Sequence, residues 1–367
     1  MSEKSLKVAV IGAGMIANAG HIPAWKNCGD DVEVVAVFNR SIERAQQTAA
    51  RHDIPQAYDD CAKMLAEVQP DIACVCTPNV SHKEYALVAF EAGAHVFCEK
   101  PIAARYADAV EMFERAEERG RILFVTQTGR FANRTLAAKE VADSGQLGDM
   151  YYAETSALRR RGVPTWGRFH ISDDSAGGPL CDLGVHALDA LLWIMGSPKV
   201  VAASGATYTK IANGDEGLVE DLAASGAPVG VYEPRPYSAA EYDVEDMAAG
   251  FLRLDTGATI SLKASWAANI PDGTGTSFIL GDKAGLRLDP LTLIGTAGRY
   301  QADTVLKVPA DPDVPFYGHW KAAAHFVRVL RGDEELMIEK DQVLNVIGAL
   351  DALYRSAEEG CEVRLQG

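Results

Sequence analysis

Three side chains in this sequence could together move a proton and stabilise charge on a reacting oxygen. Lys100 precedes Pro101, and an X–Pro bond in the cis form would fix the direction of the lysine. Asp182 and His186 are four residues apart, which on a helix places both side chains on one face. Histidine is a suitable base near neutral pH, and a lysine ammonium can stabilise a developing alkoxide. We therefore expect Lys100, Asp182 and His186 to be catalytic and to bind substrate.

A glycine-rich turn follows the first apolar run of the chain, Lys7–Ile11. It reads Gly12-Ala13-Gly14-Met15-Ile16-Ala17 and fits the pattern G-x-G-x-x-G/A. The first glycine permits a tight turn, the second lets the backbone approach a pyrophosphate, and the alanine lets the next helix pack closely. The N-terminus of that helix then faces the phosphates. We expect a dinucleotide to be bound by Gly12, Gly14, Met15 and Ile16.

The second apolar run, Val32–Phe38, ends at Asn39 and Arg40. Enzymes that use NAD usually carry Asp or Glu at this position, where it binds the adenosine ribose. Asn39 has no charge that would repel a 2′-phosphate, and Arg40 could pair with that phosphate or stack on adenine. These residues favour NADP over NAD. The alternative is that Arg40 is only a solvated arginine in a loop and binds no ligand.

Further polar residues follow later apolar runs, at positions where this type of sheet binds its ligand. The run Asp71–Cys76 leads into Thr77, Pro78 and Asn79, and His82 comes shortly afterwards. An alternative role for His82 is to cap the following helix. The complete set expected at the cofactor from these later strand ends is Thr77, Pro78, Asn79, His82, Glu99, Lys100 and Gln127.

The elements that position these residues fall into two patterns. Up to about residue 128, short apolar runs alternate with helical segments, which predicts a doubly wound parallel sheet, a Rossmann domain, over 1–128. The remaining part, 129–367, contains alternating segments such as Ala258–Trp266 and predicts an α+β domain with a large, mostly antiparallel sheet. We expect the overall class to be α/β. We expect residues 213–243 to form a surface excursion, that is, a long loop that serves as either a lid or a subunit arm.

Composition excludes several classes of function. The chain of 367 residues has a formal charge of −16, which disfavours nucleic acid and anionic membranes as partners. No apolar run is long enough to span a membrane, and no signal segment is visible, so the sequence predicts a cytoplasmic protein. Its seven cysteines show neither a disulfide framework nor zinc-ligand spacing, which favours reduced core cysteines and no metal site.

Four motifs in this order resemble the glucose-fructose oxidoreductase/inositol dehydrogenase family, known as Gfo/Idh/MocA. The motifs are the glycine-rich turn, Thr77-Pro78-Asn79 with His82, Glu99-Lys100-Pro101, and the stretch from Gly178 through Asp182 to His186. The resemblance implies NAD(P)-linked oxidation or reduction of a secondary alcohol or ketone in a sugar, cyclitol or related polyol. It also implies a homodimer or homotetramer built through the C-terminal sheet, and it puts Lys100, Asp182 and His186 at the family's catalytic positions.

The same resemblance extends to residues that approach cofactor and substrate. It places Arg159-Arg160-Arg161 and Trp166 in such a stretch. Arg168 and His170, in a polar segment close to Gly177-Gly178, are further candidates for substrate binding, and Tyr317 and His319 could also reach the site. Two alternatives remain: a glycoside hydrolase that uses bound NAD for transient redox, and a catalytically silent cofactor-binding regulator.

Overall fold

The computed structural model describes residues 4–214, 228–271 and 273–365, and it divides the chain into two compact units. Unit 1 comprises Met1–Thr128, Ala227–Pro234 and Pro312–Lys340. Unit 2 comprises Gly129–Gly226, Arg235–Asp311 and Asp341–Gly367. No helix among the described residues is both long and apolar enough to cross a membrane.

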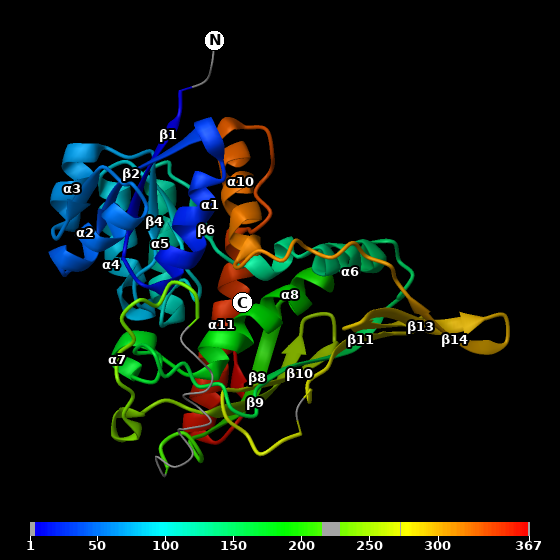
Figure 1. The fold of residues 1–367 in the computed structure, drawn as a ribbon. Coiled ribbons are helices and arrows are strands. Elements are labelled where there is room, and N and C mark those ends of the chain that lie inside the picture. Colours follow the sequence, from blue (N-terminus) through cyan, green and yellow to red (C-terminus); the bar gives the residue numbers. More distant parts are fainter. Residues whose placement is uncertain (1–3, 215–227, 272, 366–367) are drawn as a thin grey trace. The chain divides into compact units, whose positions relative to one another are not determined.

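Unit 1 is built on a six-stranded parallel sheet with the order β3-β2-β1-β4-β5-β6 (Figure 1). The order reverses between β1 and β4, which is the switch point where this class of sheet binds ligands. Its strands are β1 (Leu6–Ile11), β2 (Val32–Phe38), β3 (Gln56–Tyr58), β4 (Ile72–Val75), β5 (His95–Cys98) and β6 (Leu123–Val125). Central strands such as β4 are buried along their whole length, because helices cover both faces of the sheet.

Two helices of unit 1, α2 and α3, begin at side-chain caps that the sequence supplies. Ser41 accepts a hydrogen bond from the Arg44 amide at the start of α2, and Asp60 does the same for Lys63 at the start of α3. The helical elements are η1 (Ala17–His21), α1 (Ile22–Lys26), η2 (Gly29–Asp31), α2 (Ile42–Arg51), α3 (Cys61–Val68), η3 (Asn79–Ser81), α4 (His82–Glu91), α5 (Tyr106–Glu118) and α10 (Tyr317–Arg331). The Rossmann fold predicted from the sequence is thus confirmed.

Unit 2 contains a nine-stranded sheet with the order β14-β13-β12-β11-β7-β10-β9-β8-β15 (Figure 1). Only the β7–β10 pair is parallel among the described pairings, so the predicted mostly antiparallel sheet is also confirmed. The strands are β7 (Met150–Leu158), β8 (Val200–Tyr208), β9 (Met247–Leu254), β10 (Thr259–Ser265), β11 (Ser277–Gly281), β12 (Gly285–Leu288), β13 (Leu291–Ala297), β14 (Tyr300–Val305) and β15 (Val363–Arg364).

One face of this sheet packs on helices and the other carries polar and aromatic side chains. On β10, Ile260 and Leu262 are buried, whereas Ser261 and Lys263 on the opposite face are partly exposed. The remaining elements are α6 (Asn133–Asp143), α7 (Ser172–Ser175), η5 (Leu180–Gly184), α8 (Val185–Ile194), η7 (Ala239–Glu241) and α11 (Lys340–Glu359), with η4 (Thr128–Phe131) at the boundary of the units.

Candidate active site

The glycine-rich turn of unit 1 has the geometry that its sequence pattern requires. Gly12 adopts a φ of +112°, and a Cβ atom there would lie 2.7 Å from the carbonyl oxygen of Cys76. No heavy atom lies within 4 Å of a Cβ placed on Gly14, so the backbone is open to a ligand at that point. Ala17 is completely buried and begins η1, a π-helical turn of the kind that is frequent at functional sites.

Two buried polar atoms just after strands of the parallel sheet have no partner among the described residues. They are Oγ1 of Thr77, just after β4, and Oε1 of Gln127, just after β6. Buried polar atoms normally form hydrogen bonds, and these two lie beyond the carboxyl ends of parallel strands. Together with the open space at Gly14, they fit the ribose and amide groups of a nicotinamide dinucleotide.

The end of β2 presents the two residues expected near the adenosine ribose. The Asn39 side-chain oxygen accepts a hydrogen bond from the Ser41 amide at 2.9 Å. This bond holds the Asn39 side chain inside the loop, whereas Arg40 is exposed. The loop therefore presents a cation and no carboxylate at the position where NAD enzymes usually carry an acid.

Part of the excursion predicted over 213–243 packs against the glycine-rich turn within unit 1. A Cβ atom on Gly230 would lie 2.8 Å from the carbonyl oxygen of Met15 and 2.7 Å from the Cβ of Ala19. The guanidinium of Arg51 stacks over the Tyr232 ring at 3.4 Å. The section 215–227 of that excursion lies outside the described residues.

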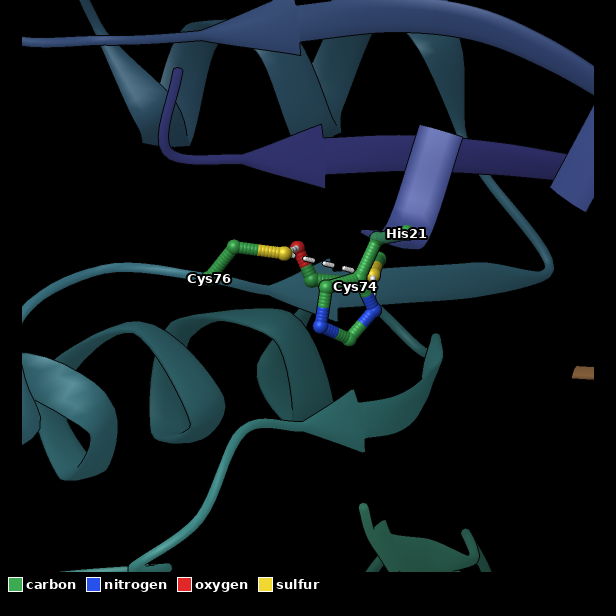
Figure 2. Close-up of side chains that lie close together, drawn as sticks. All are labelled: His21, Cys74 and Cys76. Atoms are coloured by element: carbon green, nitrogen blue, oxygen red, sulfur yellow. Dashed lines mark hydrogen bonds between the residues drawn. The ribbon is translucent and has the colours of Figure 1, made fainter. Parts of the chain in front are cut away.

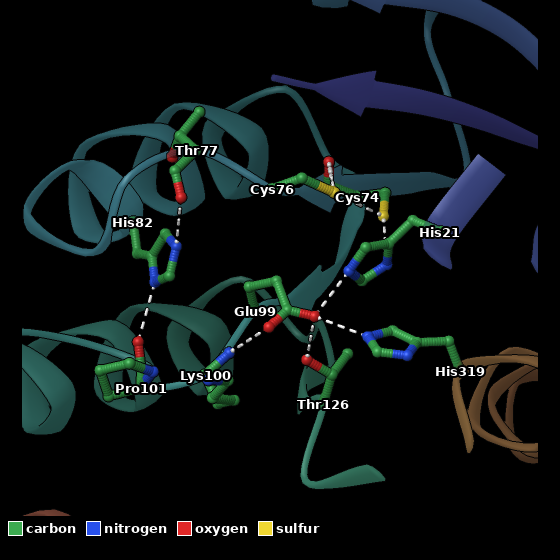
Figure 3. A network of polar contacts seen from close by, with 10 residues as sticks. All are labelled: His21, Cys74, Cys76, Thr77, His82, Glu99, Lys100, Pro101, Thr126 and His319. Carbon is green, nitrogen blue, oxygen red and sulfur yellow. Dashed lines mark hydrogen bonds and ion pairs between the residues drawn. The ribbon is translucent and has the colours of Figure 1, made fainter. Parts of the chain in front are cut away.

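Glu99 is the centre of a buried network at the end of β5. Its Oε1 atom lies 2.7 Å from His21 Nε2, 3.0 Å from His319 Nε2 and 2.8 Å from the Thr126 hydroxyl, which donates to it. Its other oxygen accepts a hydrogen bond from the Lys100 amide at 3.1 Å (Figure 3). The network therefore joins four segments of unit 1, including the one that carries Lys100.

Charges in this network stabilise one another. Burial would raise the pKa of Glu99, but the two histidine rings beside it hold that pKa well below its usual value. Burial would also lower the pKa of His21, yet the neighbouring Cys74 and Glu99 raise it to about 10. Conversely, burial raises the pKa of the Cys74 thiol, whereas Cys76, His21 and Trp25 lower it to about 5. His21 therefore lies between Glu99 and Cys74, and the lowered pKa of each favours its negatively charged form.

Lys100 follows Glu99 just after β5, and its bond to Pro101 is cis. His82 is fully buried beside it and bridges two loops. Its Nδ1 lies 2.9 Å from the Pro101 carbonyl oxygen, and its Nε2 lies 2.9 Å from the Thr77 carbonyl oxygen (Figure 3). The ring thus ties the strand end that carries Thr77 to the turn that carries Lys100.

In unit 2, Asp182 and His186 lie on one continuous helical segment, as predicted. Its first turn, η5, is π-helical and α8 continues from it, so the turn at Asp182 is wider than an α-helical turn. The indole N–H of Trp266 donates a hydrogen bond to Asp182 Oδ2 at 3.0 Å. Trp266 is fully buried, so Asp182 is held by a rigid donor.

The start of this helical segment is fixed by Glu245. Its carboxylate accepts hydrogen bonds from the amides of Gly178 at 2.9 Å and Leu180 at 3.0 Å, and from the Tyr354 hydroxyl at 2.8 Å. A carboxylate at a helix N-terminus is stabilised by the unpaired amides there. A Cβ on Gly178 would lie 2.1 Å from the Glu245 carbonyl oxygen, so only glycine fits at this point.

The other predicted substrate residues, Arg168 and His170, and the predicted cofactor residue Trp166 also lie in unit 2. Arg168 pairs with Asp174. The His170 ring is fully buried between Tyr237 and Tyr242, with ring centroids 4.9 and 6.1 Å away, and neither of its nitrogens has a partner among the described residues. The carbonyl of Trp166 accepts a hydrogen bond from the Arg235 amide.

A basic pocket of 620 Å³ opens at the end of β7. It is lined by Leu158, Arg159, Arg160, Arg161, Ile270, Pro271 and Gly273. The Arg159 amide bonds to the Ser265 carbonyl, and Ser265 precedes Trp266, the residue that holds Asp182. The pocket and Asp182 are thus connected through the same end of β10.

The structure therefore gathers the predicted cofactor residues of the N-terminal part at one edge of the parallel sheet, and Asp182 and His186 on one helix of unit 2. Sequence reasoning missed His21 and Trp266, which hold Glu99 and Asp182. A histidine inside the apolar segment Ala17–Trp25 was the available signal for the first. The contact between Trp266 and Asp182 spans 84 residues and has no local signal.

Comparison with known proteins agrees with this geometry. Residues 6–127 match the model of an oxidoreductase family with an NAD-binding Rossmann fold, and residues 135–300 match the GFO/IDH/MocA C-terminal domain. D-glucoside 3-dehydrogenase of Escherichia coli (strain K12) is 33% identical over 367 residues, which cover 100% of this chain and 99% of that protein.

Solved structures share the fold at lower identity. An oxidoreductase domain protein from Kribbella flavida superposes with a TM-score of 0.82 at 20% identity, covering 99% of this chain and 100% of that one. A levoglucosan dehydrogenase in complex with NADH and levoglucosan gives a TM-score of 0.80 at 19% identity, covering 99% and 100%. With two family models matched across both units, the chain belongs to the Gfo/Idh/MocA family of NAD-binding oxidoreductases.

Proposed function

We propose that this protein interconverts a secondary alcohol and a ketone on a sugar or related polyol, with Lys100, Asp182 and His186 as its catalytic residues. The observation that carries the proposal is the position of Lys100, at the end of β5 with its amide bonded to the buried Glu99 carboxylate. The substrate class is supported by the full-length relative named D-glucoside 3-dehydrogenase.

The chain's own residues supply binding and proton chemistry. When bound, the nicotinamide exchanges a hydride with the substrate carbon. The Lys100 ammonium donates a hydrogen bond to the reacting oxygen and stabilises its developing charge. His186 accepts the hydroxyl proton during oxidation and returns it during reduction. Asp182, held by Trp266, orients His186 or binds a neighbouring hydroxyl of the substrate.

Lys100→Ala tests this mechanism directly. We expect kcat/KM to fall by about 100-fold or more, which is typical for losing a donor to a developing oxyanion. Binding of the dinucleotide should persist, and the exposed Lys307→Ala serves as a matched control. Activity within ~3-fold of wild type would refute the role of Lys100, because that is a loss of less than ~1 kcal/mol.

The assay is a panel of glycosides, aldoses and cyclitols with NAD⁺ and NADP⁺, followed by the absorbance of the reduced cofactor. Net reduction of added cofactor is the result expected for a dehydrogenase. Release of the aglycone without added cofactor would instead indicate the transient-redox glycosidase. Cofactor binding without turnover of any substrate in the panel would favour the regulator.

The cofactor preference is a separate inference. Asn39 and the exposed Arg40 support binding of a 2′-phosphate, so we infer that NADP⁺ is preferred over NAD⁺. Asn39→Asp places a negative charge beside that phosphate and should shift the ratio of kcat/KM values toward NAD⁺ by ~10-fold, or ~1.4 kcal/mol. Arg40→Ala should shift the ratio in the same direction. An unchanged ratio in both variants would reject this inference.

We also infer that the protein forms a homodimer or homotetramer through the nine-stranded sheet. Phe251, on the face of the nine-stranded sheet that is opposite the helices, is 36% exposed beside the partly exposed Lys263 and Glu154. Such a broad face favours contact with a second copy of the chain. Light scattering should give the mass of two or four chains, and a monomer at micromolar concentration would contradict the inference.

A further inference from the structure

Three side chains with metal-binding atoms meet beneath the glycine-rich turn of unit 1. The Cys74 sulfur lies 3.3 Å from His21 Nδ1 and 3.5 Å from the Cys76 sulfur. One ligand atom from each residue lies within 4.8 Å of the others, and all three residues are buried. Figure 2 shows His21 projecting from its helical turn toward the two cysteines of β4 and its end.

These separations are close to those that a zinc ion requires. With Zn–S bonds of ~2.3 Å and Zn–N bonds of ~2.0 Å at tetrahedral angles, ligand sulfurs lie ~3.8 Å apart and sulfur and nitrogen ~3.5 Å apart. The distances from the Cys74 sulfur to His21 Nδ1 and to the Cys76 sulfur are below these values by about 0.2–0.3 Å, and the third pair of ligand atoms lies within 4.8 Å. Two thiolates and a neutral imidazole would balance the charge of Zn²⁺.

The second nitrogen of His21 adds an independent observation. Its Nε2 lies 2.7 Å from the Glu99 carboxylate, and the same carboxylate is held by Thr126 and His319 (Figure 3). Histidines that bind metals almost always donate their other N–H to a carboxylate or carbonyl, which orients the ring. The pair Glu99–His21 has this arrangement, with Nδ1 beside the Cys74 sulfur.

A third observation concerns Trp25. Its indole N–H is buried and has no hydrogen-bond partner of normal length among the described residues. The Cys74 sulfur is the group that this indole approaches. A metal-bound thiolate is a better acceptor for this N–H group than a neutral thiol, which would resolve an otherwise unpaired buried donor.

We propose that His21, Cys74 and Cys76 bind a zinc ion that stabilises the dinucleotide-binding turn. The ion would tie η1 to the end of β4, and the Cys76 carbonyl at that end is the group that a Cβ atom on Gly12 would meet. Three protein ligands leave a fourth position for a water molecule. The site is structural, so it does not depend on the substrate or the catalytic residues proposed above.

Metal analysis of the full chain tests the proposal without any activity assay. Protein expressed with added zinc and dialysed extensively should retain about one zinc ion per chain by mass spectrometry. Cys74→Ser/Cys76→Ser should reduce the content to less than ~0.1 per chain, because the thiolate ligands are gone. Cys361→Ser, which removes an exposed cysteine, is the matched control and should leave the content unchanged.

A second measurement uses only the wild-type protein, in case the double variant fails to fold. Removal of the zinc with a chelator should lower the melting temperature of the protein. Co²⁺ added to this zinc-free protein should then produce a thiolate-to-cobalt charge-transfer band. Dialysed wild type that holds less than ~0.1 zinc and gives no such band would overturn the proposal. Zinc retained by a folded double variant would place the metal elsewhere and would also overturn it.

Discussion

Replacing Gly12 by alanine should destabilise unit 1 even when no cofactor is present. The new Cβ would lie 2.7 Å from the Cys76 carbonyl oxygen and 2.9 Å from its carbonyl carbon, and both atoms are backbone at the end of β4. Neither can rotate away, and the φ of +112° is unfavourable for any residue with a side chain. Left-handed backbone costs ~1–2 kcal/mol and the added strain is similar, so we expect a loss of ~2–4 kcal/mol.

Gly14→Ala is the matched control, because it separates packing from ligand approach. A Cβ at Gly14 has no heavy atom within 4 Å, so stability without cofactor should stay within ~1 kcal/mol of wild type. The methyl group would occupy the space that a pyrophosphate needs. We therefore expect the dissociation constant of the dinucleotide to rise by ~10-fold or more, equivalent to at least ~1.4 kcal/mol.

Two assays distinguish these effects. Urea unfolding followed by circular dichroism measures stability, and calorimetric titration measures the affinity for NAD⁺ and NADP⁺. A wild-type unfolding midpoint for Gly12→Ala would show that the clash with Cys76 is relieved in some other way. Unchanged affinity for both dinucleotides in Gly14→Ala would show that the pyrophosphate does not lie beside Gly14.

Two further perturbations test other parts of the molecule. Asp189→Asn breaks a buried ion pair that has two hydrogen bonds to Arg130, so the free energy of unfolding in urea should fall by ~3–5 kcal/mol. Glu362→Gln, at the partly exposed pair with Arg253, is the control and should lower it by less than ~1 kcal/mol. Equal losses in the two variants would contradict this prediction. Burial and the nearby Arg121 lower the pKa of His95, and its Nδ1 accepts a hydrogen bond from the Ile122 amide. The unfolded chain therefore takes up a proton at this histidine more readily than the folded protein, so the free energy of unfolding should decline as the pH falls below ~6.5. His95→Asn keeps an acceptor without titrating and should reduce that decline; an identical pH profile would refute the assignment.

Much of the fold was predictable because its signals are local. The continuous apolar runs at β1, β2 and β4 indicate strands that are buried on both faces, and the alternation along β10 indicates a sheet with one polar side. The need for glycine at position 12 was equally visible, because a tight turn between strand and helix has a known sequence pattern. The short strand β3 and strands β12 to β15 carried too little pattern to be predicted.

The sequence by itself therefore determined the class of the fold, the glycine-rich turn and the order of the motifs, all of which depend on neighbouring residues. Only the tertiary structure brought His21 to Cys74 across 53 residues and His319 to Glu99 across 220, and only it grouped Pro312–Lys340 with unit 1. The physical reason is that such contacts depend on how helices and strands pack, and packing leaves no fixed spacing in the chain.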